Sequence, residues 1–148
     1  MSEATSIKNA AGLLSPESGT SETLFEEELQ DLPEGVLLYE INGPLFFGAS
    51  QKFQEVITDL HQQPKILILR MRHVPFIDAT GMNRLREICR VLRAKGTRII
   101  ISGANRDVRK ALLTEGVYRE IGKHNIHDNI RSAIDRAKML LDDKNPLF

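Results

Sequence analysis

The chain has 148 residues, and its 20 acidic and 20 basic residues give a formal net charge of zero. This length allows one domain with a sizeable core, while zero net charge gives no general attraction to nucleic acid or anionic lipid. The single cysteine, Cys89, cannot form an internal disulfide and is expected to pack inside a helix. The sequence has no apolar run of the roughly 20 residues that a membrane span needs and no signal-peptide pattern in residues 1–30, so we expect this chain to be soluble.

The beginning of the chain differs in charge from the rest. Residues 1–35 contain eight acidic residues and one basic residue, whereas the remaining residues contain 12 acidic and 19 basic ones. Because Ser, Thr, Gly and Pro occur here without periodicity, we expect residues 1–32 to be a disordered acidic leader. The stretch 24–32 is either a solvated tether or a short element that docks on the basic domain. We expect the domain at residues 33–141 and a tail at residues 142–148.

The first predicted elements are a hairpin and a helix. Residues 36–41 have the composition of a strand, and the Asn-Gly-Pro sequence at 42–44 is a strong turn signal. Residues 45–47 are expected to form the paired strand. Ser50 is a candidate N-cap for a helix whose apolar residues repeat at helical spacing until the chain reaches Pro64.

Two apolar runs follow, with a helix between them. Residues 65–70 and 98–102 have the continuous apolar character of strands that are covered on both faces. The helix between them shows a core-facing stripe and is expected to end at Gly96, because glycine suits a left-handed C-cap.

The last third continues the alternation. A helix is expected after Asn105, a short strand near residues 120–122, and a last helix from about His127. Alternating strands and helices predict a parallel core, to which the opening hairpin adds antiparallel edges. The predicted fold class is therefore α/β, a sandwich with a mixed sheet of four to five strands and about four helices.

The turn at residues 74–82 carries the strongest local signals. Asp78, Thr80 and Gly81 lie where a buried strand passes into a helix, and Asp78 is expected to cap that helix with its side chain. Junctions of this kind expose backbone N–H groups at the positive end of a helix, where partners and anions are commonly met. The turn is therefore either a partner-binding site or only a helix cap.

The sequence contains no convergent catalytic or metal-binding set. A His73–Asp78 pair is conceivable, but no nucleophile stands beside it. His124 and His127 are close in sequence, but no further residues complete a metal-ligand spacing. We therefore expect no enzymatic activity, no cofactor and no metal.

Basic residues are concentrated in the middle of the chain. Such a concentration fits acidic lipid headgroups, an acidic protein partner or a nucleotide, and it fits equally well a set of solvated helix faces. The residues are Arg70, Arg72, Arg84, Arg86, Arg90, Arg93, Lys95, Arg98, Arg106, Arg109 and Lys110.

Three motifs in register resemble one known family. They are Asn-Gly-Pro-Leu-Phe-Phe at 42–47, Val-Pro-Phe-Ile-Asp-Ala-Thr-Gly at 74–81 and Ser-Gly-Ala-Asn at 102–105. In this order and spacing they resemble the STAS domain, over roughly residues 32–141. The family includes bacterial anti-sigma factor antagonists and the cytoplasmic C-terminal domains of SulP-type anion transporters, and the stretch 43–49 is particularly similar to the transporter branch.

This resemblance implies a non-catalytic regulatory and interaction domain of a SulP-type transporter of sulfate-like anions, located at the cytoplasmic face of the inner membrane. Transport itself would be carried by a membrane domain absent from this chain. The implied partners are that membrane domain, a second copy in a homodimer, and an acidic protein or a nucleotide. Nucleic acid is not among them.

Two faces are the candidate binding sites. The partner-binding turn is expected to consist of Asp78, Ala79, Thr80, Gly81 and Arg84. A second face, toward the membrane domain or a second subunit, is expected to consist of Pro44, Leu45, Phe46, Phe47 and Ser50.

One position departs from the antagonist branch of the family. In the antagonists, a serine directly after the aspartate of this turn is phosphorylated, and this switches partner binding off. Here that position is Ala79, which has no hydroxyl. Thr80 as the acceptor instead is a hypothesis, and a free-standing antagonist without the usual phosphoacceptor serine is the alternative function.

Overall fold

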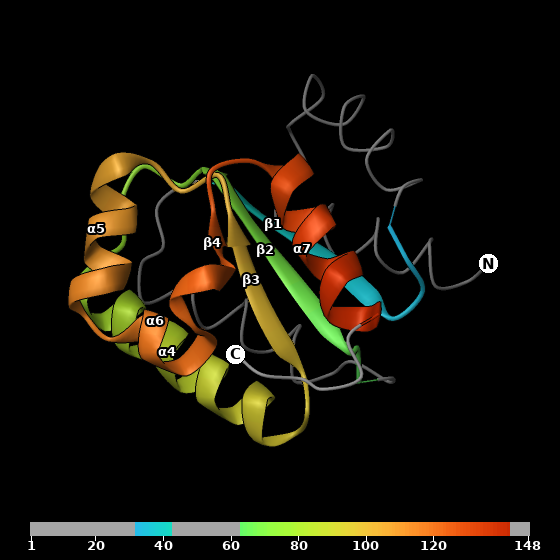
Figure 1. Cartoon of the computed structure of the whole chain (residues 1–148). Coiled ribbons are helices and arrows are strands. Elements are labelled where there is room, and N and C mark those ends of the chain that lie inside the picture. The colour runs from blue at the N-terminus through green and yellow to red at the C-terminus, as the bar shows by residue number, and fades with distance from the viewer. Residues whose placement is uncertain (1–31, 43–62, 143–148) are drawn as a thin grey trace.

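Four parallel strands form the sheet in the part of the chain that the structure, a computed structural model, describes: residues 32–42 and 63–142. The strands are β1 (Val36–Asn42), β2 (Ile66–His73), β3 (Arg98–Ser102) and β4 (Ile126–His127), and their order in the sheet follows their order in the chain. Each neighbouring pair is parallel, so the predicted parallel core is confirmed (Figure 1).

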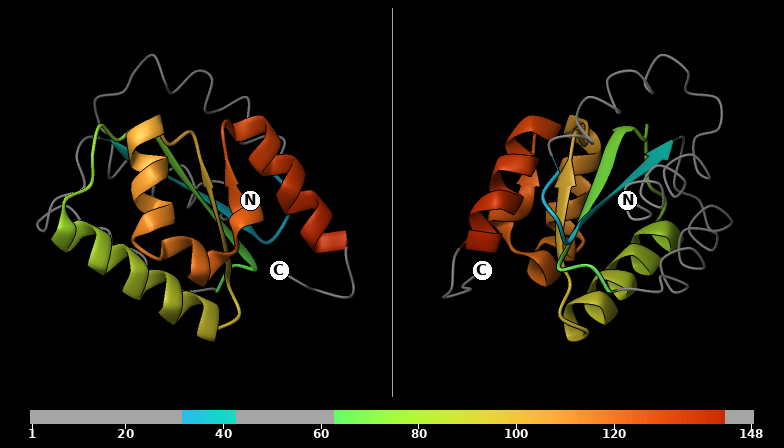
Figure 2. Two further views of the ribbon diagram at one scale, coloured as in Figure 1. Left: turned by 60° about the vertical axis from the view of Figure 1, so that its left-hand side comes forward. Right: turned by 90° about the vertical axis from the view of Figure 1, so that its right-hand side faces the viewer.

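Helices cover both faces of this sheet. They are α4 (Ala79–Ala94), α5 (Arg106–Thr114), α6 (Val117–Ile121), a 3-10 turn η1 (Lys123–Asn125) and α7 (Ile130–Asp142). Figure 2 shows α4 and α7 on opposite faces of the sheet. The predicted α/β sandwich is therefore confirmed.

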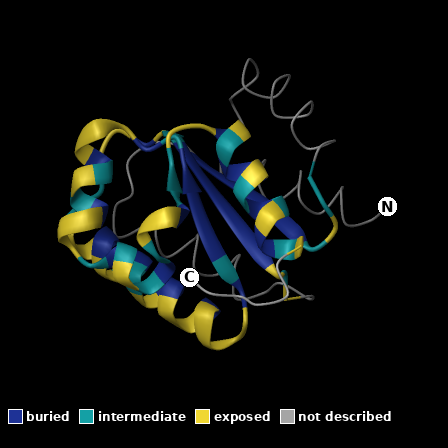
Figure 3. Cartoon of the chain, in the orientation of Figure 1, coloured by how far each residue is buried: buried dark blue, intermediate teal, exposed yellow. Residues whose placement is uncertain are grey.

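Each face has its own hydrophobic core. On one face, side chains of the strands pack with α4, α5 and α6, for example Leu69 with Leu85. On the other face, Leu38, Ile68 and Ile100 lie in register on three adjacent strands and pack with α7. The central strand β2 is buried through its first six residues, as its apolar sequence predicts (Figure 3).

Glycine ends α4 as predicted. The helix stops at Ala94, and Gly96 follows with a φ of +95°, a left-handed conformation that glycine adopts without steric cost. The chain then enters β3, so this turn sets the spacing between α4 and the sheet.

In the last third one predicted strand is wrong, and the last helix is confirmed but starts later than predicted. The stretch near residues 120–122 is not a strand, because residues 117–121 form α6, whose Val117 and Ile121 lie one turn apart and are both buried. The strand comes later, at residues 126–127, and α7 starts at Ile130 because the Asn129 side chain accepts a hydrogen bond from the backbone N–H of Ser132.

The leader 1–31, the predicted hairpin strand 45–47 and the helix expected after Ser50 lie outside the described residues. The antiparallel part of the predicted mixed sheet therefore stays a prediction. No helix in the described ranges has the length and apolar character to cross a membrane.

Candidate functional site

The turn between β2 and α4 is built around the Asp78 side chain. The backbone N–H of Gly81 donates to Asp78 Oδ1 at 2.7 Å, and the N–H of Met82 donates to the Asp78 carbonyl oxygen at 2.8 Å. Asp78 itself is extended, with ψ at 175°. These are the features of an N-cap residue, so the predicted capping role is confirmed.

The side chains around this cap differ in exposure. Ala79 and Thr80, the first two residues of α4, are exposed, whereas Gly81 is buried. Just before the cap, the Phe76 side chain is 47% exposed. The turn therefore presents a short exposed surface on a helix start that its own aspartate fixes.

Arg84 lies one turn further along α4. Its Nη1 atom is 4.0 Å from Glu87 Oε1, an i, i+3 contact at the limit of an ion pair, and its side chain is 35% exposed. Pairs of this kind contribute little to stability. Arg84 is thus a half-buried cation beside the turn.

Asn105 was not among the predicted site residues, yet it holds the turn in place. Its Nδ2 atom donates to the carbonyl oxygens of Val74 and Pro75, at 3.4 and 3.2 Å. Its Oδ1 atom accepts from the N–H of Val108 at 2.7 Å, so Asn105 also caps α5. In the sequence, the asparagine of the Ser-Gly-Ala-Asn motif predicts a helix start but gives no sign of this contact with the loop.

A buried carboxylate lies at the end of β1. Glu40 is 3% exposed, and its Oε2 atom is 3.5 Å from Arg72 Nε and 3.9 Å from His73 Nε2. Because burying a charge without a partner is costly, these contacts stabilise Glu40 at this edge of the sheet. The carboxylate near His73 is thus that of Glu40. Glu40, Arg72 and His73 together form a structural cluster of ionisable side chains.

Within residues 32–42 and 63–142, no group of three or more His, Cys, Asp or Glu residues has a geometry that would hold a metal ion. The Cys89 thiol is fully buried, and this burial raises its pKa to about 12. Since the thiolate is the reactive form, Cys89 is a packed core residue, as predicted.

The predicted concentration of basic residues does not form one free patch. Arg70 is buried, at 4% exposure, and Arg72 contacts Glu40. On α4, Arg86 Nη1 donates to the Glu115 carbonyl at 2.7 Å, and Arg93 Nη1 donates to the carbonyls of Arg119 and Glu120. These arginines stabilise the C-terminal ends of α5 and α6, where carbonyl groups carry partial negative charge.

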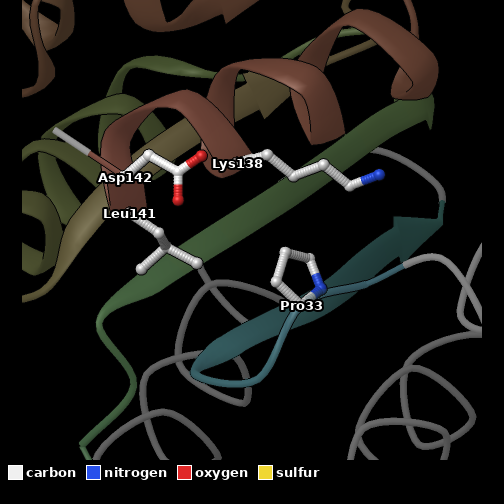
Figure 4. A pocket seen from close by; sticks show the side chains of 4 residues that line it. All are labelled: Pro33, Lys138, Leu141 and Asp142. Carbon is white, nitrogen blue, oxygen red and sulfur yellow. The ribbon is translucent and has the colours of Figure 1, made fainter.

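A shallow pocket lies at the other end of the molecule. Pro33, which precedes β1, and the last turns of α7 line it with Lys138, Leu141 and Asp142 (Figure 4). Since β1 and β2 are parallel, the pocket lies at the strand starts and the candidate turn at the strand ends. The pocket and the turn are separate features.

Comparison with known proteins identifies the family. The sequence pattern of the STAS domain matches residues 31–133. The Bacillus subtilis protein YvdB, whose name describes it as a candidate sulfate transporter, is 28% identical over 130 residues, which are 87% of this chain and 22% of that protein. This chain thus spans about a fifth of the length of that relative.

Two solved structures extend the comparison. A sulfate transporter family protein from Wolinella succinogenes is 39% identical, with a TM-score of 0.71 over 76% of this chain and 92% of that one. The STAS domain of a SulP transporter from Vibrio cholerae is 32% identical, with a TM-score of 0.69 over 80% of this chain and 96% of that one. Since the family pattern covers more than half of the residues and the folds agree, this chain belongs to the STAS domain family.

Proposed function

We propose that this chain is the non-catalytic regulatory and interaction domain of a SulP-type anion transporter, located at the cytoplasmic face of the inner membrane. The observation that carries the proposal is its similarity to a SulP transporter STAS domain that it matches over 96% of that domain's length, at 32% identity. Transport of the sulfate-like anion would occur in a separate membrane domain. That domain would make up the remainder of a protein such as YvdB.

The docking surface in this proposal is the turn from Asp78 to Gly81, with Arg84 beside it. The cap bond from Gly81 to Asp78 and the bonds from Asn105 to the preceding loop support this choice, because they fix the backbone before a partner arrives. Ala79 and Thr80 are the exposed side chains that a partner would meet. The second predicted face, from Pro44 to Ser50, lies outside the described residues.

The sequence at the helix start weighs against the free-standing antagonist. Ala79 is exposed at the first position of α4, where a serine hydroxyl would be accessible to a kinase, and alanine offers no phosphoacceptor. Thr80 is exposed one position later. Phosphopeptide mapping after incubation with cell extract and ATP tests Thr80, and an unmodified Thr80 would exclude it as the acceptor.

Sequencing the transcript that encodes this chain tests its place in a transporter. We expect the reading frame upstream of Met1 to continue through several apolar spans of about 20 residues each. A frame that starts at Met1 beside a kinase gene would contradict the proposal and favour the antagonist.

A variant tests the docking surface in the full-length transporter. Thr80→Arg places a large cation on the exposed turn, and we expect it to reduce sulfate uptake severalfold at equal amounts of protein in the membrane. Thr114→Arg, at the exposed end of α5, is the matched control and should leave uptake unchanged. Equal uptake by both variants and the unmodified protein would show that the turn is not a docking surface.

A further inference from the structure

A serine and a histidine meet where β4 leads into α7, at the carboxyl edge of the sheet (Figure 1). The Ser132 Oγ atom lies 3.1 Å from His127 Nδ1, which is within hydrogen-bond distance. His127 belongs to β4, and Ser132 is the third residue of α7. A hydroxyl beside an imidazole nitrogen is the arrangement of a nucleophile and its base.

A second contact fixes the tautomer of His127. Its Nε2 atom lies 2.9 Å from the carbonyl oxygen of His124, and a carbonyl oxygen only accepts hydrogen bonds. Nε2 therefore carries the proton of the neutral ring, and the lone pair of Nδ1 is left to accept from the Ser132 hydroxyl. The three groups follow one another as nucleophile, base and orienting acceptor, which is the order that activates a hydroxyl.

The surroundings keep the imidazole neutral at physiological pH. Burial lowers the pKa of His127 below the usual 6.5, the carbonyl hydrogen bond opposes this shift, and the charge of Arg136 adds to it. Arg136 is held in position because its Nε atom donates to Oδ1 of the buried Asn125 at 2.8 Å. The carboxylate of the next residue, Asp128, pairs with Arg109 of α5. His127 is therefore free to accept a proton.

Backbone contacts hold both side chains in place before any reaction. The His127 carbonyl oxygen accepts from the Gly103 N–H at 3.0 Å, which ties β4 to the end of β3. The Ser132 N–H donates to Asn129 Oδ1 at 2.9 Å, so the cap of α7 fixes the residue that carries the hydroxyl. The hydroxyl also lies 3.3 Å from the Asn129 carbonyl oxygen, and the contact with His127 is the shorter of the two. Such fixed geometry favours reaction.

The pair is open to solvent and lies where negative charge is stabilised. Ser132 and His127 are half-buried, whereas the residues between and beside them, Asp128, Asn129 and Arg131, are exposed. Helical side chains tilt toward the N-terminus, so the hydroxyl lies beside the positive end of α7. The first turn of α7 contains no acidic residue. A helix start of this kind stabilises the negative charge that develops when a hydroxyl attacks a carbonyl group.

We propose that Ser132 accepts an acyl group from an activated ester or thioester, with His127 as its general base. In this step the bond from Ser132 Oγ to the acyl carbon forms, and the bond from that carbon to the leaving oxygen or sulfur breaks. The serine proton passes to His127 Nδ1 and from there to the leaving group. A single transfer modifies the domain without turnover. The site lies on a different helix from the docking turn, and the inference is independent of the transporter assignment.

Acetylation by 4-nitrophenyl acetate tests the proposal in the whole chain. We expect peptide mass spectrometry of samples quenched at successive times to find the acetyl group at Ser132, and nitrophenolate release to accompany its transfer. The rate should rise with pH through a midpoint below 6.5 and then level off, because only the neutral His127 ring accepts the proton. A rate that continues to rise in proportion to hydroxide, or no acetyl group at Ser132 and no nitrophenolate release above background, would overturn the proposal.

Two variants separate the base from the hydroxyl. His127→Gln retains a polar side chain but no base, and we expect it to slow acetylation of Ser132 by about 10²–10⁴-fold. Thr114→Ser is the matched control, because the hydroxyl at this exposed helical position donates to the Lys110 carbonyl at 3.0 Å and has no base beside that bond. The serine introduced there should react as slowly as Ser132 does in His127→Gln. Equal rates at Ser132 in His127→Gln and in the unmodified chain would show that the histidine is not the base.

A thiol at the same position distinguishes an unreactive hydroxyl from a closed site. In Ser132→Cys, a thiol-specific reagent at pH 8 should modify the new thiol rapidly, since the native Cys89 is fully buried. A thiol that reacts in this variant while Ser132 stays unacetylated in the unmodified chain would mean that His127 does not activate the hydroxyl. A thiol that fails to react would mean that no acyl donor reaches the pair, and this result would equally exclude the proposal.

Discussion

The Asn105 side-chain amide nitrogen lies 3.2 Å from the Pro75 carbonyl oxygen, so the residue that caps α5 also holds the loop that leads into α4. The two roles use different atoms, because Oδ1 accepts from Val108 while Nδ2 donates to the loop. Asn105 is therefore a positioning residue for the candidate docking turn, and the two roles are separable by substitution.

Asn105→Asp should separate them. A carboxylate still accepts from the Val108 N–H, but it has no N–H to donate to Pro75. We expect Asn105→Ala to lower the free energy of unfolding by about 0.5–2 kcal/mol through loss of the cap, and Asn105→Asp to lower it less. In both variants the backbone order parameters of Phe76 and Ile77 should fall from about 0.85 toward 0.6. Urea titration and nitrogen-15 relaxation measure the two effects, and unchanged order parameters in Asn105→Asp would contradict the positioning role.

Thr80 allows a test of the charge preference at the candidate turn. The first turn of α4 contains no acidic residue, although a helix N-terminus stabilises negative charge. We expect Thr80→Glu to be more stable than its neutral control Thr80→Gln by about 0.3–1 kcal/mol at low salt. Chemical denaturation of the two variants measures this difference, which should vanish near 1 M salt. A more stable Thr80→Gln would show that repulsion from Asp78 exceeds the helix dipole.

The core of the fold was predictable because its signals are local. The apolar run of β2, the Asp78 cap and Gly96 each belong to a short stretch whose geometry follows from residue type. The helix at residues 117–121 is hard to predict because five residues that bury only Val117 and Ile121 show little periodicity. The flanking glycines, Gly116 and Gly122, are typical turn residues whether a short helix or a short strand lies between them.

The site was less predictable because it depends on contacts between distant residues. Nothing in the sequence near Asn105 indicates that its amide reaches a carbonyl 30 residues earlier. The arginines of α4 had the spacing of a free basic face, yet Arg86 and Arg93 donate to carbonyls at the ends of other helices. Charge composition predicts how many cations are present, and only the packing of helices decides which of them remain available.

Cys89 should be unreactive in the folded protein. Its thiol is fully buried, and a pKa of about 12 keeps it protonated across the physiological range. We expect a thiol-specific reagent at pH 8 to modify Cys89 only as fast as the protein opens or unfolds, and rapidly in concentrated urea. Thr80→Cys in a Cys89→Ala background is the control, because this exposed position should react at once. Fast modification of native Cys89 would show that the core opens around α4.

His127 should make the stability of the domain depend on pH. Burial lowers the pKa of its imidazole below the usual 6.5, and the nearby Arg136 adds to this effect, while the hydrogen bond to the His124 carbonyl opposes it. The unfolded chain therefore binds a proton at His127 more readily than the folded chain does. The stability that neutral His127 contributes to the fold is complete above pH 6.5 and is lost as the pH falls through the folded pKa. Urea unfolding at successive pH values should therefore show a shallower loss below pH 6.5 for His127→Gln than for the unmodified chain. If the free energy of unfolding falls equally steeply with pH in both proteins, His127 is solvated in the folded protein. A titration midpoint at or above pH 6.5 for the His127 ring, followed by NMR, would lead to the same conclusion.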